Sequence, residues 1–324
     1  MKLLAPTLLA LTLAASAAAQ PVPPLLDAGS DNTVSELVVV AHPQGPPLWR
    51  VQNGDNTLVI LGAVTPMQQQ QRWEQRPLFA ALDDARLLLT LPKPDLRPVQ
   101  IMGLLTGNIW KVRQRADLEP QLPADLRARF VAARTHAWEK DGRYKNWKPA
   151  VAGFLLLSDY RRSFGFSEGK PGSTVEKAAK DFGVPTQPIA ATRVGLLIKV
   201  ATGLDDAQNM TCLREALDQM EYEGARAQTL NDDWAHGDVK SVIARYKVSA
   251  GQRCLMQAPG GRELVEQEMS KAADRLWAEL QKPGKVVAVV DMAWLYPQGG
   301  LLDRLKAKGA VVGPPAALRD VETD

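Results

Sequence analysis

Histidine and cysteine, the side chains that most often bind transition metals, are rare in this 324-residue chain. It contains three histidines (His42, His136 and His236) and two cysteines (Cys212 and Cys254). No pair of histidines has a metal-ligand spacing, and the set is too small for a zinc finger or an iron–sulfur cluster. These residues alone therefore predict no metal site.

A serine nucleophile is the next chemistry that the sequence offers. The run GFSEG, centred on Ser167, matches the five-residue elbow of serine hydrolases. The chain order Ser, Asp, His is completed by His236 and one of three aspartates, Asp205, Asp232 or Asp233. The elbow must join a buried strand to a helix, but a helical pattern precedes Ser167 and a Lys-Pro-Gly sequence follows it. A serine hydrolase is therefore the less favoured hypothesis.

Acidic and aromatic side chains offer two further kinds of site. Acidic residues that could act as acid and base lie near one another at Glu221, Glu223, Asp232, Asp233, Glu266 and Glu268. We interpret them as solvated helix faces. Tryptophans that could stack on sugars are Trp49, Trp138, Trp147, Trp234, Trp277 and Trp294, which we assign to core or rim packing.

His236 and Gly237 mark a helix break, and Asp238 is predicted to cap the next helix.

Composition indicates a folded globular protein. Hydrophobic residues make up 45% of the chain and charged residues 23%, which argues against disorder and coiled coil. The formal charge is +3, and the basic residues are scattered, so nucleic acid is not an expected partner.

The first nineteen residues have the features of a secretory signal peptide, which are a basic start at Lys2, an apolar run and small residues up to Ala19. We expect cleavage near Ala19, a periplasmic or secreted protein, and no membrane span. A Pro-rich leader at 20–45 follows. In an oxidising compartment Cys212 and Cys254 are predicted to form a disulfide, with two buried free thiols as the alternative.

Hydrophobic patterns place the elements that must position any site. A hairpin is expected from Leu48–Val51 and Thr57–Ala63, then a helix over Trp73–Asp84 and a buried strand over Arg86–Leu91. Residues 99–248 are mostly helical in pattern, with a short strand at Thr186–Ile189. A helix containing Val265 to Leu280, a strand at Lys285–Asp291, a helix at Gly300–Lys308 and a strand at Ala310–Val312 follow. This order predicts an α/β fold: a mixed sheet flanked by helices, with a largely helical middle section.

Several segments together resemble one family. PPLWRVQNGDNTLVILGAVTPM resembles the opening of the TraB/GumN family, relatives of the animal Tiki proteins, in which a hairpin leads to Gly-x-x-His. AALDDARLLLTLP resembles the family's next strand, and VVAVVDMAWLYPQGGLLDRLKAKGAVV resembles its C-terminal signature. The resemblance implies a TraB/GumN-like domain at 46–313 and a tail at 314–324.

The resemblance also implies a manganese or cobalt ion, held by two histidines and a glutamate and used to hydrolyse peptide bonds. This chain departs from the family at each ligand position: Thr65 and Trp294 replace the histidines, and Thr90 replaces the glutamate. An ungapped alignment puts Glu268 and Met269 where the family has an Arg-Asn pair. Hydroxyls and an indole are poor ligands for divalent metals, so we expect no cofactor.

The sequence thus predicts a pseudoenzyme that acts by binding, with Thr65, Thr90, Glu268 and Trp294 around the ancestral site and Trp294 as the best contact. Its partner would be an envelope protein or a small ligand. The alternative is a residual metal-dependent peptidase with substitute ligands, such as Asp291, Glu268 or His236.

Overall fold

The computed structural model describes residues 45–90, 109–190 and 202–315, all within one compact unit. The predicted signal peptide, His42, most of the predicted leader and most of the predicted tail lie outside these ranges. No helix in the described ranges is long and apolar enough to cross a membrane.

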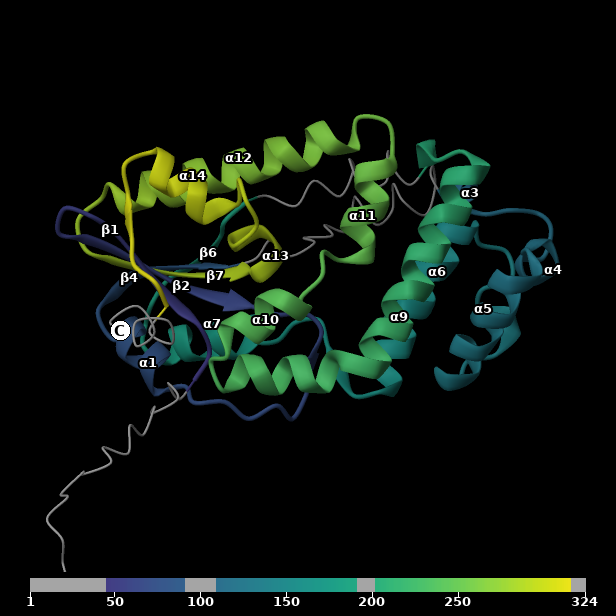
Figure 1. The fold of residues 1–324 in the computed structure, drawn as a ribbon, viewed down its shortest axis with the longest axis horizontal. Coiled ribbons are helices and arrows are strands. Elements are labelled where there is room, and N and C mark those ends of the chain that lie inside the picture. The colour runs from purple at the N-terminus through teal and green to yellow at the C-terminus, as the bar shows by residue number, and fades with distance from the viewer. Residues whose placement is uncertain (1–44, 91–108, 191–201, 316–324) are drawn as a thin grey trace, which may run out of the picture. The chain divides into compact units, whose positions relative to one another are not determined.

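A six-stranded mixed sheet forms the centre of the fold, in the order β6-β4-β7-β2-β1-β8 (Figure 1). Its strands are β1 (Leu48–Asn53), β2 (Asn56–Ala63), β4 (Ala85–Thr90), β6 (Thr186–Pro188), β7 (Lys285–Asp291) and β8 (Val311–Val312). Strands β2, β7, β4 and β6 run parallel, whereas β1 is antiparallel to both of its neighbours. The predicted α/β class and its central strands are confirmed.

Helices cover both faces of this sheet, which is why β7 is an almost continuous apolar run rather than an alternating one. Helices α12 (Gly261–Leu280) and α14 (Leu301–Ala307) lie on one face, and α1 (Arg76–Leu82) and α7 (Gly172–Asp181) on the other (Figure 1). The core between them, called the sheet core here, includes Leu58, Ile60 and Val287, none of which is exposed.

A second apolar cluster, called the helical core here, is formed mainly by α5 (Ala124–His136), α6 (Pro149–Ser163) and α9 (Asp206–Ala235). The remaining short elements are β3 (Met67–Gln68), α3 (Ile109–Val112), α4 (Leu118–Gln121), η2 (Asp141–Arg143), β5 (Phe166–Ser167), α10 (Val239–Arg245), α11 (Ala250–Gln257) and α13 (Met292–Leu295). The predicted disulfide is present, and Cys212–Cys254 joins α9 to α11.

Two local predictions differ from the structure. Helix α1 begins at Arg76 rather than at Trp73, because Pro77 occupies its first turn and the ring of Trp73 instead packs edge-on against Trp234, 5.4 Å between centroids. Trp138 is 88% exposed and has φ of +61°, so assigning it to packing was wrong. It follows the last turn of α5, where the chain leaves the helix in the left-handed region.

Helix α9 is attached to the sheet at its C-terminal end by buried polar side chains. The indole N–H of Trp234 donates to the carbonyl oxygen of Gly62 at 2.6 Å. Asn231 donates to the carbonyl of Pro66 at 3.1 Å and accepts from the N–H of Gln68 at 2.7 Å. Neither Trp234 nor Asn231 is exposed. These bonds fix the chain that leaves β2.

Replacing Trp234 with Phe should therefore destabilise the protein by about 2–4 kcal/mol, because it leaves a buried carbonyl without a donor and removes ring volume. Urea unfolding measures the change. Trp138→Phe, at an exposed ring, is the matched control and should stay within about 0.5 kcal/mol of the parent. Equal effects of the two substitutions would contradict the assignment.

Candidate functional site

Three of the predicted site residues come together at the carboxyl edge of the parallel strands. Thr65 follows β2, Thr90 ends β4, and Trp294 lies on α13, which begins directly after β7. Because β2, β7 and β4 are parallel neighbours, these ends meet at one edge of the sheet, where open α/β sheets usually bind ligands.

Glu268, the fourth predicted residue, lies on α12, which packs on a face of the sheet. Its carboxylate forms an ion pair with Lys271, one turn along the same helix, at 2.8 Å. Met269 beside it packs against the sheet core.

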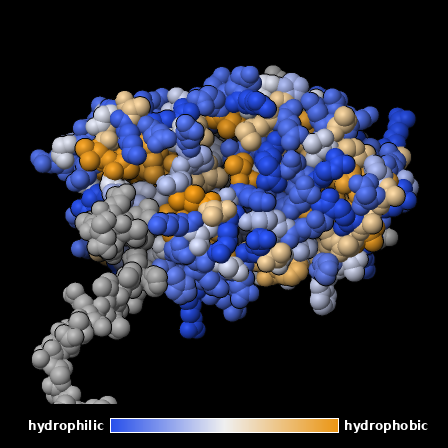
Figure 2. Space-filling view, in the orientation of Figure 1, coloured by the Kyte–Doolittle hydropathy of each residue, from blue (hydrophilic) through white to orange (hydrophobic). Residues whose placement is uncertain are grey.

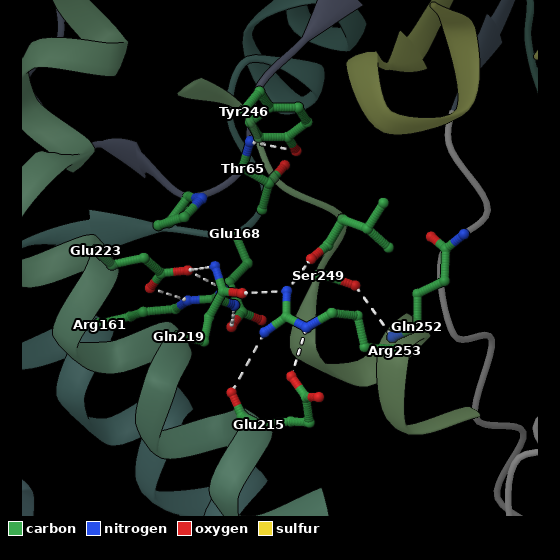
Figure 3. A network of polar contacts seen from close by, with 12 residues as sticks. Thr65, Arg161, Glu168, Glu215, Gln219, Glu223, Tyr246, Ser249, Gln252 and Arg253 are labelled. Atoms are coloured by element: carbon green, nitrogen blue, oxygen red, sulfur yellow. Dashed lines mark hydrogen bonds and ion pairs between the residues drawn. The ribbon is translucent and has the colours of Figure 1, made fainter. Parts of the chain in front are cut away.

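A chain of hydrogen bonds links the ends of β2 and β7 through Tyr246, which follows α10. The backbone N–H of Thr65 donates to the Tyr246 hydroxyl oxygen at 3.0 Å (Figure 3). That hydroxyl donates to Asp291 at 2.8 Å, and the other carboxylate oxygen of Asp291 accepts the N–H of Ala293 at 2.8 Å. Asp291 therefore caps α13 and holds Tyr246 at the same time.

Burial sets the protonation of this pair. It raises the pKa of Asp291 from its ordinary value of 3.8 to about 6, against the opposing effect of its two donors. Burial and the nearby carboxylate also raise the pKa of Tyr246 well above its usual range. Tyr246 thus keeps its proton at physiological pH, and Asp291 takes up a proton just below neutrality.

The indole of Trp294 has a fixed position. Its N–H donates to the side-chain carbonyl of Gln252 on α11 at 3.0 Å, and its ring packs against the sheet core. Strand β2 is closely packed at Gly62. A Cβ added there would lie 2.5 Å from both the Met292 sulfur and the Trp49 ring. Only glycine fits this position.

A small cleft opens beside these residues, between α10 and α13, with a volume of about 190 Å³. We call it the apolar cleft. Its walls are formed by Ile243, Tyr246, Val248, Met292, Ala293, Tyr296 and Pro297. Figure 2 shows a mostly hydrophilic face on which apolar side chains gather near the centre, in the region of α10 and α13.

A family model described as the TraB/PrgY/gumN family matches residues 47–314. The chain belongs to the TraB/PrgY/gumN family. Searches of curated proteins and of solved structures found no significant match. The matched range contains Thr65, Thr90, Glu268 and Trp294, as well as Tyr246 and Asp291.

In this family member, the described residues contain no group of three or more His, Cys, Asp and Glu side chains placed to hold a metal ion. All three of the proposed substitute ligands make local contacts, and that of Glu268 is its ion pair with Lys271. The Nδ1 atom of His236 lies 2.7 Å from the carbonyl oxygen of Asp232 at the end of α9, and Asp291 holds Tyr246 and α13.

The serine-hydrolase pattern is used structurally. Ser167 ends the two-residue strand β5 and its hydroxyl accepts the N–H of Gly169, so it does not lie on a strand-to-helix elbow. Glu168 of the same motif pairs with Arg161 at 2.6 Å. As predicted, His236 ends a helix and Asp238 caps the next, accepting the N–H of Ser241 at 3.0 Å.

One acidic prediction was wrong, because Glu223 is buried rather than solvated. Arg161 donates to both of its carboxylate oxygens, at 2.5 and 2.8 Å, and Gln219 donates to one of them at 2.7 Å. The network continues through Arg253 to Glu215 (Figure 3). These contacts join α6, α9 and α11, and no local sequence pattern indicates them.

Asp291 makes stability depend on pH in a defined direction. Its pKa is higher in the folded state than in the unfolded chain, so the folded state binds more protons between about pH 4 and 6. This carboxyl therefore lowers stability as pH rises through that window, by about 2 kcal/mol.

Asp291→Asn keeps one carbonyl acceptor for its two donors, the Tyr246 hydroxyl and the Ala293 N–H, and removes the titration, so its stability relative to the parent should increase from pH 4 to pH 6. Urea unfolding at each pH measures the difference. Parallel stability curves for the two proteins would show that Asp291 titrates normally. Carboxyls with a lowered pKa, such as that of Glu279, make stability rise with pH. They are present in both proteins, so their effect cancels when the two stability curves are subtracted.

Proposed function

We propose that this TraB/PrgY/gumN-family protein is a periplasmic or secreted pseudoenzyme that has lost the divalent-metal site and acts by binding at the carboxyl edge of its sheet. The observation that carries the proposal is Trp294, at the position of a family histidine. Its only polar atom is an N–H donor, and that donor is used on Gln252.

The other two positions support the same conclusion. Thr90 is 5% exposed and Thr65 offers a hydroxyl, so neither supplies the negative charge or basic lone pair that offsets dehydration of a divalent ion. Asp291, which Tyr246 links to Thr65, has a raised pKa and already accepts two hydrogen bonds. Without a bound ion, the side chains of Thr65, Thr90 and Trp294 would not lower the pKa of a water toward neutrality.

Elemental analysis tests the loss of the metal site. After incubation with manganese, cobalt or zinc and dialysis, the protein should retain no stoichiometric ion, and a chelator should leave its melting temperature unchanged. The matched control is the triple variant Thr65→His, Thr90→Glu, Trp294→His, which restores the implied ligand types. One ion per chain in the parent would overturn the pseudoenzyme assignment and call for peptidase assays.

Export is supported by the N-terminal sequence and by the Cys212–Cys254 bond, since disulfides persist in oxidising compartments. When the full chain is expressed in a bacterial host, the mature protein should be found in the periplasm and begin near Gln20. Mass spectrometry checks both the N-terminus and the absence of free thiols. An uncleaved cytoplasmic chain with two reactive thiols would contradict export.

A further inference from the structure

The loop between α10 and α11 separates two hollows. On one side is the apolar cleft, and on the other is a groove of about 410 Å³ against α9, which we call the polar groove. Tyr246 lines the cleft, Lys247 lines the groove, and Val248 lines both. Val248 is therefore a wall that the two hollows share.

The polar groove is lined by two acids and two bases, and Lys247 is the one of these four charges that pairs with no opposite charge among the described residues. Glu215 and Asp218 in its wall are each paired with an arginine, Glu215 with Arg253 and Asp218 with Arg129, both at 2.5 Å. The ammonium of Lys247 lies 4.2 Å from the ring centroid of Tyr222, and in the part of the chain that is described it has no acidic partner.

A second cation reinforces this charge. The guanidinium of Arg226 lies 5.9 Å from the same Tyr222 ring and likewise pairs with no acid among the described residues. Tyr222 is itself oriented by its hydroxyl, which donates to the carbonyl of Arg245. The Tyr222 ring thus gathers two cations beside it, an arrangement that suits an anionic group.

We propose that the apolar cleft and the polar groove together bind a single-chain amphiphilic carboxylate, with its carboxylate at Lys247 and its apolar chain in the cleft. This inference rests on the proposed binding function and names its ligand class. The cleft volume suits a short alkyl chain, and its lining is mainly apolar, as small-molecule sites usually are.

A peptide fits these hollows less well. Their walls come from helices α9, α10, α11 and α13 and from connecting loops, and no described strand edge borders either hollow. An extended peptide would therefore find no row of backbone donors and acceptors with which to pair.

Calorimetric titration of the full-length, processed protein with decanoate and with decanol tests the proposal. Decanoate should bind. Lys247→Gln should weaken decanoate binding about tenfold, because it removes a charge-assisted contact, and should leave decanol binding unchanged. Lys240→Gln, at an exposed lysine of α10, is the matched control and should bind decanoate like the parent.

Filling the cleft is the second arm. Ala293→Leu should weaken both ligands, and Val248→Trp on the loop provides an independent filling variant if the first is unstable. The proposal is overturned if decanoate fails to bind, if Lys247→Gln binds it as well as the parent, or if an acidic peptide binds in its place. A metal-free protein that does not bind decanoate contradicts this inference alone, whereas a metal-loaded protein contradicts the proposed function.

Discussion

The hydrogen bond from Trp234 to the carbonyl of Gly62 holds together the two parts of this fold. It closes at the point where β2 ends, so that the chain running toward Thr65 starts from a fixed position. Gly62 has no room for a side chain, and its carbonyl is buried, which makes the indole N–H the group that satisfies it. Asn231, three residues before Trp234, fixes the following turn in the same way.

At the carboxyl edge, several side chains each join two elements. Asp291, at the end of β7, bonds to the first turn of α13 and to Tyr246 in the loop after α10. Tyr246 in turn accepts a hydrogen bond from Thr65, which follows β2. Gln252 brings α11 onto α13 through Trp294. Among the described residues, this edge is held together by the hydrogen bonds of Tyr246, Asp291 and Trp294.

Much of this arrangement follows from the sequence. The strands are predictable because β2, β4 and β7 are short apolar runs, and their parallel order places Thr65, Thr90 and Trp294 at one edge. Tyr246 is not predictable, because its partners lie 181 and 45 residues away and no motif surrounds it.

The buried pair of Arg161 and Glu223 was missed for a related reason. Acidic residues that lie near one another on a helix are typical of a solvated face, and only the packing of α6 against α9 shows that Glu223 is covered. For Trp138 the error was the reverse, because a residue predicted to be packed is exposed. A large apolar side chain is buried on average, but Trp138 lies just after the end of a helix, where the chain leaves the packed core.

The length of α9 has a consequence for how the molecule loses its structure. Its N-terminal half supplies Leu213 and Met220 to the helical core, and its last turns supply Leu230 and Trp234 to the sheet core. Neither core can come apart while α9 stays intact without exposing an apolar stripe of that helix to water. We therefore expect the two cores to melt as one cooperative unit, and cutting the chain within α9 would leave two fragments that each lack half of that helix.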